Sequence, residues 1–403
     1  MTVLFGHPTG NPNSHQAALA HYEAGTLAAF CVPWMPARST IRFLERAAPD
    51  SNLVRRFSRR YFPPLVDAPK VQGRTGEIRR LMMRMISRND GERFSYEAND
   101  WLMRTMARES RRDGVRAVHS YEDCSLWQFE EAKRNGQACI YDMPIGFYPA
   151  WEETQSALAR KWADWLPPGG LPSNRHVRPQ QKRREMELAD LVLVPGSFVE
   201  QTVRRFCDDK RIGRAQYGVD LDFWQPKEHN NEGRLRFIYA GQISLRKGIP
   251  LLLEAWQAAG LHDAELQLVG MWQLAESKRA LLPPNVFHCP QCSRQDLREH
   301  YRGADVFVFP SFFEGFALAF LEALASGLPA IATEAASGRD VLDDSCGRLI
   351  PTGDADALVS ALRWFADHRE CLPVMRRAAR ARAERFTWAA YRQSVKQCVA
   401  PFV

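Results

Sequence analysis

Short apolar runs alternate with amphipathic segments along the whole chain. The runs are continuous rather than alternating and are bounded by Gly, Pro or Asp, which is typical of parallel strands buried on both faces. Helical segments between such strands predict βαβ units. The runs that we predict as strands are Thr2–Gly6, Val115–His119, Ala138–Tyr141, Asp190–Val194, Arg236–Ala240, Glu265–Val269, Val286–His288, Asp305–Phe309, Pro329–Thr333 and Arg348–Ile350.

Ten strands of this kind are too many for one comfortable sheet, so the pattern predicts an α/β fold with two doubly wound parallel-sheet domains. The segment Tyr217–Asp220 is typical of a turn after a strand, and Pro226–Gly233 is polar and typical of a linker. We therefore predict a first domain over residues 1–216 and a second over 217–385. Residues 386–403 are expected to form a helix that packs back on the first domain.

The composition mainly argues against a secreted or membrane-spanning protein. The chain has 403 residues, of which 45% are hydrophobic and 25% charged, as in ordinary globular proteins. Its nine cysteines are scattered, and its first residues do not resemble a secretory leader. No apolar run approaches the roughly 18 residues of a membrane span. We therefore expect a reduced, cytoplasmic protein.

The formal net charge of +7 is unevenly distributed along the chain. Residues 38–116 contain 19 Lys and Arg against 10 Asp and Glu, an excess of nine positive charges, so the rest sums to −2. Such a region favours an acidic partner, for example anionic lipid, nucleic acid or a phosphate-bearing substrate. A solvated, Arg-rich helical surface explains the same pattern, because acidic residues are mixed throughout it.

The sharpest candidate chemistry lies in residues 306–333, where two glutamates stand eight positions apart. Glu314 follows an apolar run and sits in a Phe-Glu-Gly turn, whereas Glu322 falls within an Ala- and Leu-rich segment that predicts a helix. A strand, a turn and a helix in this order aim the helix N-terminus at the carboxyl edge of a parallel sheet. That edge is where α/β proteins bind ligands.

A second candidate is the loop Gly241–Gly248, which follows the predicted strand Arg236–Ala240. Gly241 lets the backbone come close to a ligand. The adjacent cations Arg246 and Lys247 suit the negative charges of a diphosphate. The alternative is an Arg-Lys pair that only faces solvent.

These motifs together closely resemble those of the retaining family 4 glycosyltransferases, which carry the Glu-x7-Glu signature and have the GT-B fold. The resemblance covers about residues 180–387. It implies two Rossmann-like domains that face each other across a cleft. The first domain would bind the acceptor, and the second would bind a nucleotide diphosphate sugar as donor.

The resemblance also assigns roles to side chains of the second domain. Arg246 and Lys247 would neutralise the leaving diphosphate, Glu314 would contact the donor sugar, and Glu322 would hold the ribose hydroxyls. Residues that begin the following helix would bring free N–H groups to the phosphates. The remaining donor-binding candidates are Gly241, Gly315, Phe316 and Ala317.

The first domain resembles the family less closely. Gly10 is the nearest match to a glycine pair that covers the donor phosphates in the family, and Asn11 of the same loop is a candidate sugar contact. A plain turn is the alternative for this loop. His119 matches the first histidine of the family's His-x-His pattern, although a lone histidine here is more often structural. Tyr121 stands where the second, sugar-contacting histidine is usual, so we predict Tyr121 in the catalytic site.

The resemblance implies sugar transfer with retention and without a nucleophilic side chain, a metal or another cofactor. The donor would be UDP- or GDP-linked. The acceptor would be a hydroxyl of a saccharide, free or lipid-linked, in polysaccharide or lipopolysaccharide assembly. The sequence has no Asp-x-Asp motif at a strand end, and the two cations of the Gly241–Gly248 loop would take over the charge stabilisation that a metal supplies elsewhere.

Two other hypotheses stay open: a glycosyltransferase that acts on a small soluble metabolite, and a sugar-nucleotide-binding partner subunit without transfer. Arg42–Phe62 interleaves basic and aromatic residues, and Leu81–Ile86 is apolar and cationic, which suits peripheral docking at the inner face of a membrane. More often, such a pattern marks a core-facing amphipathic helix. We expect no nucleic-acid partner, because no known nucleic-acid-binding motif is present.

Overall fold

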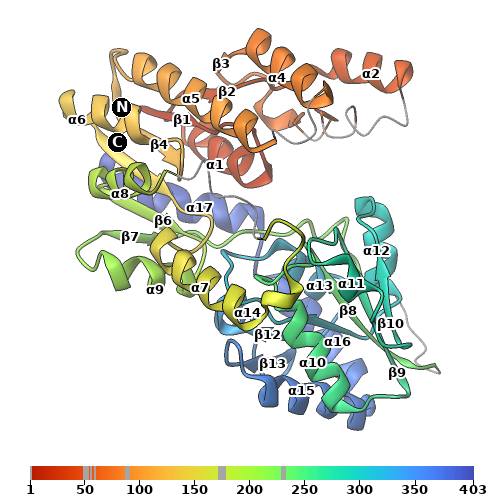
Figure 1. Cartoon of the computed structure of the whole chain (residues 1–403). Helices are drawn as coiled ribbons and strands as arrows, with labels where there is room; N and C mark the ends of the chain where they lie inside the picture. The colour runs from red at the N-terminus through yellow and green to blue at the C-terminus, as the bar shows by residue number, and fades with distance from the viewer. Residues whose placement is uncertain are drawn as a thin grey trace.

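The computed structural model describes residues 2–48, 54, 57–58, 60–86, 91–170, 178–227 and 233–403. It contains two all-parallel sheets, each flanked by helices, which confirms the predicted fold class (Figure 1). Part of Arg42–Phe62, the side chains of Leu81–Ile86 and part of the linker Pro226–Gly233 lie outside the described residues.

The first sheet has seven strands in the order β3-β2-β1-β4-β5-β6-β7. The strand order reverses between β1 and β4, so the carboxyl ends of these two strands flank a topological switch point, where open α/β sheets bind ligands. The strands are β1 (Thr2–Gly6), β2 (Leu27–Val32), β3 (Lys70–Gln72), β4 (Val115–Tyr121), β5 (Ala138–Asp142), β6 (Leu191–Val194) and β7 (Ile212–Arg214).

The second sheet has six strands in the order β10-β9-β8-β11-β12-β13. Its switch point lies between β8 and β11, which pair in parallel. The strands are β8 (Leu235–Ala240), β9 (Ala264–Val269), β10 (Val286–Cys289), β11 (Val306–Phe309), β12 (Ala330–Thr333) and β13 (Gly347–Ile350).

Helices connect the strands and cover both faces of each sheet (Figure 1). In the first unit they are α1 (Pro12–Glu23), α2 (Arg38–Ala47), α4 (Arg74–Ile86), α5 (Gly91–Glu109), α6 (Leu126–Arg134), α7 (Tyr148–Lys161), α8 (Pro179–Leu188) and α9 (Ser197–Phe206). The later helices are α10 (Ile249–Ala259), α11 (Glu276–Arg279), α12 (Arg294–Arg302), α13 (Leu318–Ala325), α14 (Gly338–Val341), α15 (Ala355–Asp367), α16 (Leu372–Ala383) and α17 (Trp388–Val399).

All ten predicted strands are present within two residues of their predicted bounds, but three further strands were missed. β3 and β7 are three-residue edge strands with polar residues, so they carry too few apolar positions to give a periodic signal. β2 reads LAAFCV, and its two alanines weaken its β-propensity although all but one of its residues are buried.

The last helix belongs to the first unit in space. α17 lies against α1, and Arg392 and Lys396 of α17 both pair with Glu23 of α1, with contacts of 3.0 and 2.7 Å. The Arg392 guanidinium also donates to the Gln16 Oε1 at 2.7 Å. Figure 1 shows α17, in blue-violet, beside the first sheet and away from the second sheet. The chain therefore crosses between the two units twice.

One further segment connects the two units. After β5 the chain forms an isolated antiparallel bridge between Ile145 and Gly315, and α7 then lies over the second unit. The Trp151 ring on α7 lies 5.3 Å from the ring of Phe313. This contact places the carboxyl edge of the first sheet next to the segment that follows β11. Among the described residues, the structure contains no helix with the length and apolar character to cross a membrane.

Candidate functional site

The loop between β8 and α10 is held tightly against the end of β11. Gly248 caps α10 with a φ of 73°, and a Cβ at this position would lie 2.1 Å from the carbonyl oxygen of Pro310. Only glycine fits this approach. The Arg246 carbonyl then accepts a hydrogen bond from the Phe312 N–H at 2.8 Å. The two loops that flank the second switch point are thereby joined into one surface.

Three charged side chains meet on this surface, as the sequence predicted for Arg246, Lys247 and Glu314. The Glu314 Oε1 accepts from the Arg246 Nη1 at 2.7 Å and from the Lys247 ammonium. The Arg246 Nη1 also donates to the Phe313 carbonyl at 2.7 Å. The Lys247 Nζ lies 4.7 Å from the centre of the Phe309 ring, a cation–π contact.

The charges of this cluster do not balance. Glu314 and Lys247 are both only 8% exposed. Burial would raise the pKa of Glu314, but Lys247 and Arg246 outweigh this and lower its pKa, so the carboxylate is ionised. Two cations then share one anion, which leaves one positive charge in excess. A buried net charge is unfavourable unless a counter-charge joins it, so the cluster is suited to bind an anion.

The predicted start of the following helix was wrong by a few residues. We expected Gly315, Phe316 and Ala317 to begin the helix, but α13 begins at Leu318 with Ala317 as its N-cap. Gly315 instead pairs with Ile145, and a Cβ on it would lie 1.6 Å from the Pro144 carbonyl oxygen. The close approach of the two units requires extended backbone here. The free N–H groups at the start of α13 still lie at the carboxyl edge.

Glu322 lies apart from the Arg246, Lys247 and Glu314 cluster, although it is on the same helix-and-turn segment. Its carboxyl is mostly buried, and burial raises its pKa to about 7; Arg294 and the Trp224 indole lower it, whereas Asp220 raises it. Arg294 itself donates to the Asp220 Oδ2 at 3.0 Å. Glu322 therefore faces the α12 side of the second unit.

In the first unit, the loop after β1 has a clear structural organisation. Asn11 caps α1: its side chain accepts from the Ser14 N–H at 2.8 Å, and Gly10 has a φ of 67°. The Gly10 N–H donates to the Nδ1 of His7 at 3.0 Å. Burial, and to a lesser extent His15, lowers the pKa of His7 to about 3, so its ring is neutral and can accept. The sequence interpretation missed His7.

His119 and Tyr121 both lie inside the first unit. His119 has no exposed surface, hydrogen-bonds to His21 at 2.9 Å, and has its pKa lowered to about 3 by burial. Tyr121 is 4% exposed and packs edge-on against the His7 ring, with 4.8 Å between centroids. The neutral His119 Nε2 lies 3.5 Å from the Asp142 Oδ2. The His119 ring at this edge of the first sheet is thus uncharged and closed off from solvent.

Asp142 is a candidate that the sequence interpretation missed. It is the last residue of β5, pairs in register with Tyr121, and is 4% exposed. Burial raises its pKa to about 7, against a smaller lowering by a hydrogen bond from Tyr121. The signal was available, because a polar residue directly after an apolar strand marks the carboxyl edge of a parallel sheet.

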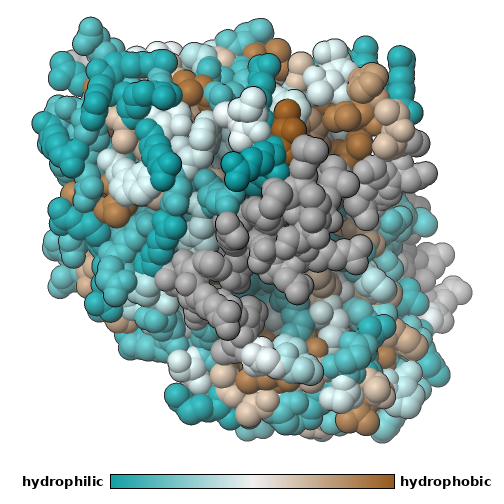
Figure 2. All heavy atoms as spheres, turned by 45° about the horizontal axis from the view of Figure 1, so that its top comes forward, coloured by the Kyte–Doolittle hydropathy of each residue, from teal (hydrophilic) through white to brown (hydrophobic). Residues whose placement is uncertain are grey.

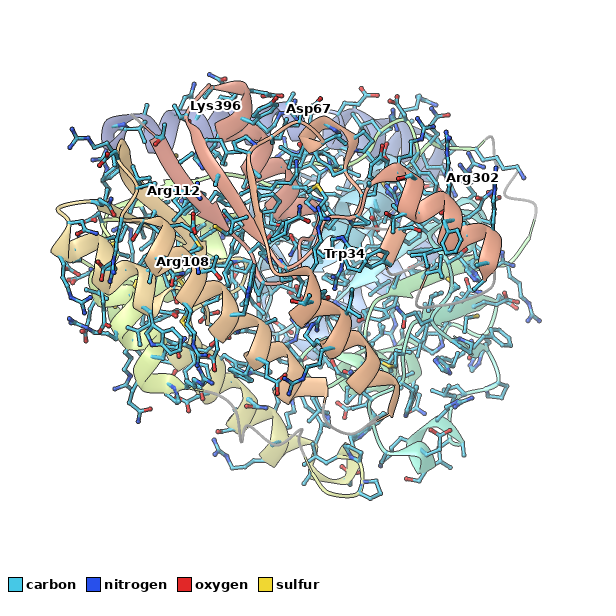
Figure 3. The ribbon with its side chains drawn as sticks, turned by 90° about the horizontal axis from the view of Figure 1, so that it is seen from above. Trp34, Asp67, Arg108, Arg112, Arg302 and Lys396 are labelled. Carbon is cyan, nitrogen blue, oxygen red and sulfur yellow. The ribbon has the colours of Figure 1, made fainter. Side chains whose placement is uncertain are left out.

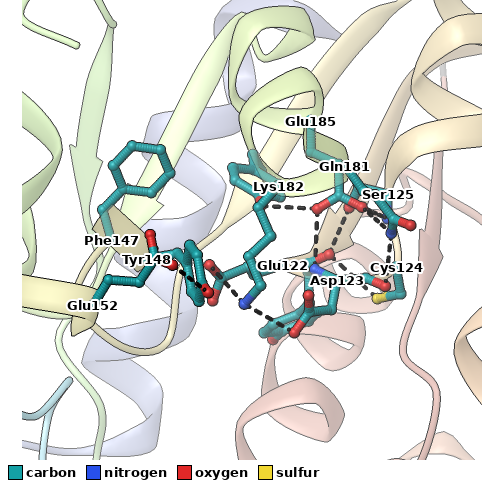
Figure 4. Close-up of polar contacts among 12 residues, drawn as sticks. Glu122, Asp123, Cys124, Ser125, Phe147, Tyr148, Glu152, Gln181, Lys182 and Glu185 are labelled. Atoms are coloured by element: carbon teal, nitrogen blue, oxygen red, sulfur yellow. Dashed lines mark hydrogen bonds and ion pairs between the residues drawn. The ribbon is translucent and has the colours of Figure 1, made fainter. Parts of the chain in front are cut away.

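The turn after Tyr121 is fixed by a buried polar network (Figure 4). The Glu185 carboxylate of α8 accepts from the backbone N–H of Asp123 and Ser125, at 3.0 and 2.8 Å, and so caps α6. Lys182 pairs with Glu122 and Asp123 at 3.3 and 3.1 Å. Asp123 has a φ of 71°, a strained conformation that these contacts hold. The network positions Tyr121 rather than offering a ligand site of its own.

No metal centre is evident in the described part of the chain, where no three His, Cys, Asp or Glu side chains are grouped to hold an ion. Cys289 and Cys292 are both free, partly buried thiols. The positive charges that the structure places at the second switch point are those of Arg246 and Lys247.

Solved structures identify the class of fold that these two units define. The chain aligns over its full length with a sucrose-phosphate synthase from Thermosynechococcus elongatus, at a TM-score of 0.66 with 17% identity and 98% of that chain covered. It also aligns with the apo form of the lipopolysaccharide outer core galactosyltransferase WaaB, at a TM-score of 0.62 with 13% identity and full coverage of both. The protein has the GT-B fold.

A family model matches the sequence of the second unit. Residues 220–382 match the family described as Glycosyl transferases group 1. The relatives include the sulfoquinovosyl transferase SQD2 of Arabidopsis thaliana, 28% identical over 50% of this chain and 42% of the relative. Another is the MMP alpha-(1->4)-mannosyltransferase of Mycolicibacterium hassiacum, 28% identical over 52% and 53%. The chain spans about half the length of these curated relatives.

Proposed function

We propose that this protein is a retaining glycosyltransferase that moves a sugar from a nucleotide diphosphate sugar to a hydroxyl of a saccharide-type acceptor. The observation that carries the proposal is the cluster of Arg246, Lys247 and Glu314 at the second switch point, with its excess positive charge. The family match of residues 220–382 supports the same reaction class. We assign the donor to the second unit and the acceptor to the first.

The proposed chemistry follows from this charge distribution. When the bond between the sugar and the diphosphate breaks, negative charge builds up on the leaving phosphate. Arg246, Lys247 and the first N–H groups of α13 stabilise that charge in a site with little water. The leaving phosphate then takes the proton of the attacking hydroxyl on the same face, so the protein supplies position rather than a nucleophile. Glu314 holds the two cations in place and contacts the sugar.

The donor proposal is tested by thermal shift with UDP, GDP, ADP and their common sugar conjugates, with and without EDTA. We expect a shift with one nucleotide that EDTA does not remove, because the cationic side chains replace a metal. Glu322→Ala should weaken that shift if Glu322 holds the ribose. No shift with any nucleotide would refute the donor site, and a shift abolished by EDTA would refute metal independence.

We further propose that the reaction belongs to polysaccharide or lipopolysaccharide assembly at the cytoplasmic face of a membrane, with a lipid-linked acceptor. Several exposed side chains support membrane contact. On α2, Phe43 is 70% exposed beside the exposed Arg42 and Arg46, and Val66 and Ile78 of the same basic region are 49% and 42% exposed. Figure 2 shows hydrophobic side chains among hydrophilic ones on the upper side of the first unit.

Other cations in the basic region already have partners. Arg108 of α5 and Arg112, which follows this helix, both pair with Glu109, and Figure 3 labels both arginines at this end of the first unit. Arg60 and Arg80 pair with the buried Glu77. Membrane affinity should therefore depend on α2 rather than on the whole region.

Sedimentation with vesicles of anionic and of neutral lipid tests this surface. We expect binding to anionic vesicles that Phe43→Ser together with Arg42→Ser reduces, whereas Arg108→Ser leaves it unchanged. Absence of vesicle binding would favour the second enzyme hypothesis, a glycosyltransferase for a small soluble acceptor. Nucleotide-sugar binding without donor hydrolysis or transfer to any acceptor would favour a non-catalytic partner subunit.

A further inference from the structure

A cavity of about 180 Å³ lies between α7 of the first unit and the carboxyl edge of the second sheet. Its floor is apolar and comes from both units: Leu158 of α7, and Leu245 and Leu274 of the second unit are all buried. The Trp151 ring forms a wall. This volume holds about six water-sized groups. It is smaller than the volume of a pocket for a whole drug-sized ligand. A single substituent of a larger substrate fits this space.

The wall that α7 provides is held firmly in place. The Trp162 indole N–H donates to the Glu254 Oε1 of α10 at 2.7 Å. The Ala275 N–H donates to the Trp165 carbonyl at 2.9 Å. Lys278 also pairs with Asp164. The cavity is therefore a built feature of the contact between the two units.

Polar side chains also line the cavity, those of Gln155, Gln242, Ser244, Arg246 and Gln273, and Arg246 belongs to the donor cluster. Arg246 lines it and reaches the Glu314 Oε1, which places the cavity beside the proposed position of the transferred sugar. Ser244 also lines it, and its buried Oγ has no hydrogen-bond partner among the described residues. Rotation about χ1 can turn a serine hydroxyl between three staggered positions. The cavity thus combines an apolar floor with a buried hydroxyl that has no hydrogen-bond partner among the described residues.

We propose that this cavity takes an acylamino substituent of the transferred sugar. The inference rests on the proposed function and adds the class of donor. The methyl group of an acetamido substituent would cover the three leucines, and its carbonyl oxygen would accept a hydrogen bond from the Ser244 hydroxyl. A plain hydroxyl at the same carbon would leave most of the apolar floor in contact with water. Such differences in pocket filling give about tenfold or more in selectivity.

The first test compares two pairs of donors, and the members of each pair differ at one carbon only. The pairs are UDP-N-acetylglucosamine with UDP-glucose, and UDP-N-acetylgalactosamine with UDP-galactose. Titration calorimetry of the full chain should give at least tenfold tighter binding of one acetamido sugar than of its hydroxyl counterpart. Equal or tighter binding of the hydroxyl sugars, or binding of GDP-mannose alone, would overturn the inference. If no nucleotide or nucleotide sugar binds at all, the proposed function itself fails.

Two variants tie the preference to the cavity. Gln155→Trp fills it from α7 and should remove the preference for the acetamido sugar while the hydroxyl sugar still binds. Ser156→Trp is the matched control, because the next residue of α7 is exposed and does not line the cavity. Ser244→Val deletes the hydroxyl and should lower the preference several-fold without filling the space. An unchanged preference in both Gln155→Trp and Ser244→Val would overturn the inference.

Discussion

The two switch points of this molecule are built from opposite kinds of chemistry. In the second unit, Arg246, Lys247 and Glu314 meet as ionised groups with one positive charge in excess. In the first unit, His119 and Asp142 are buried, and burial lowers the pKa of the histidine to about 3 and raises that of the aspartate to about 7. The same strand order and the same edge thus carry ionised groups in one half and groups that resist ionisation in the other.

This difference indicates which reactant each of the two units is suited to bind. A leaving diphosphate needs fixed positive charge, which the second unit provides. An incoming hydroxyl is neutral and needs positioning and exclusion of water, for which a neutral edge suffices. Single substitutions can remove one side chain at a time from each of the two switch points.

The largest effect is expected from Lys247→Ala. The change removes the excess positive charge, so leaving-group stabilisation is lost and turnover should fall by about tenfold or more. Steady-state transfer or donor hydrolysis measures it. Lys227→Ala is the matched control, because Lys227 is exposed and lies outside the cluster. Turnover in Lys247→Ala equal to that of Lys227→Ala would remove Lys247 from the site.

Glu314→Gln should act in opposite directions on stability and on anion binding. Without its carboxylate, the buried Lys247 and the partly exposed Arg246 repel each other unpaired, and loss of one partner from a buried ion pair costs about 3 kcal/mol. The free energy of unfolding in urea should fall by that order. The free nucleoside diphosphate should meanwhile bind several-fold tighter, because the net charge rises by one. Weaker binding together with lower stability would show that the diphosphate does not use these cations.

Asp142→Asn tests the neutral side through the pH dependence of stability. The pKa of Asp142 is raised by burial from 3.8 to about 7 in the folded state. A raised carboxyl pKa means that the folded state binds the proton more tightly, so its stability falls as the pH rises from about 4 through 7. The loss approaches about 4 kcal/mol above pH 7 as an upper limit. Asparagine stays neutral and should avoid this loss.

The measurement is urea unfolding of the wild type and of Asp142→Asn at pH 5 and pH 8. The variant should gain stability relative to the wild type between these two values. The neighbouring groups His119, Tyr121, Tyr217 and Tyr391 are present in both proteins, so their titration cancels in the difference. A difference that does not change with pH would show that Asp142 is ionised throughout or already protonated in both conditions.

The sequence predicted most strands of both sheets and singled out the three residues that form the ionic cluster, for a shared physical reason. Buried parallel strands are continuous apolar runs, and charged residues directly after such strands must lie at one edge. What the sequence could not predict depends on contacts between distant segments. The extended backbone at Gly315 follows from its approach to Pro144, 171 positions earlier. The burial of His119 likewise depends on its packing against His21 and Phe5, about 100 positions earlier, and the cavity behind Trp151 exists only once the two units meet.

The smallest effect is expected from Tyr121→Phe, which asks whether the two switch points cooperate. Tyr121 is 4% exposed and its hydroxyl approaches Asp142, so loss of the hydroxyl should lower turnover by only a few-fold if it positions the neighbouring loop. A direct sugar contact would instead raise KM for the donor and leave the unfolding free energy nearly unchanged. Comparing kcat and KM of this variant with its urea midpoint separates the two roles. If turnover, KM and stability all stay at wild-type values, the Tyr121 hydroxyl neither positions the loop nor contacts the sugar. The first unit would then contribute to the reaction through the His7 to Asn11 loop and the cavity wall of α7.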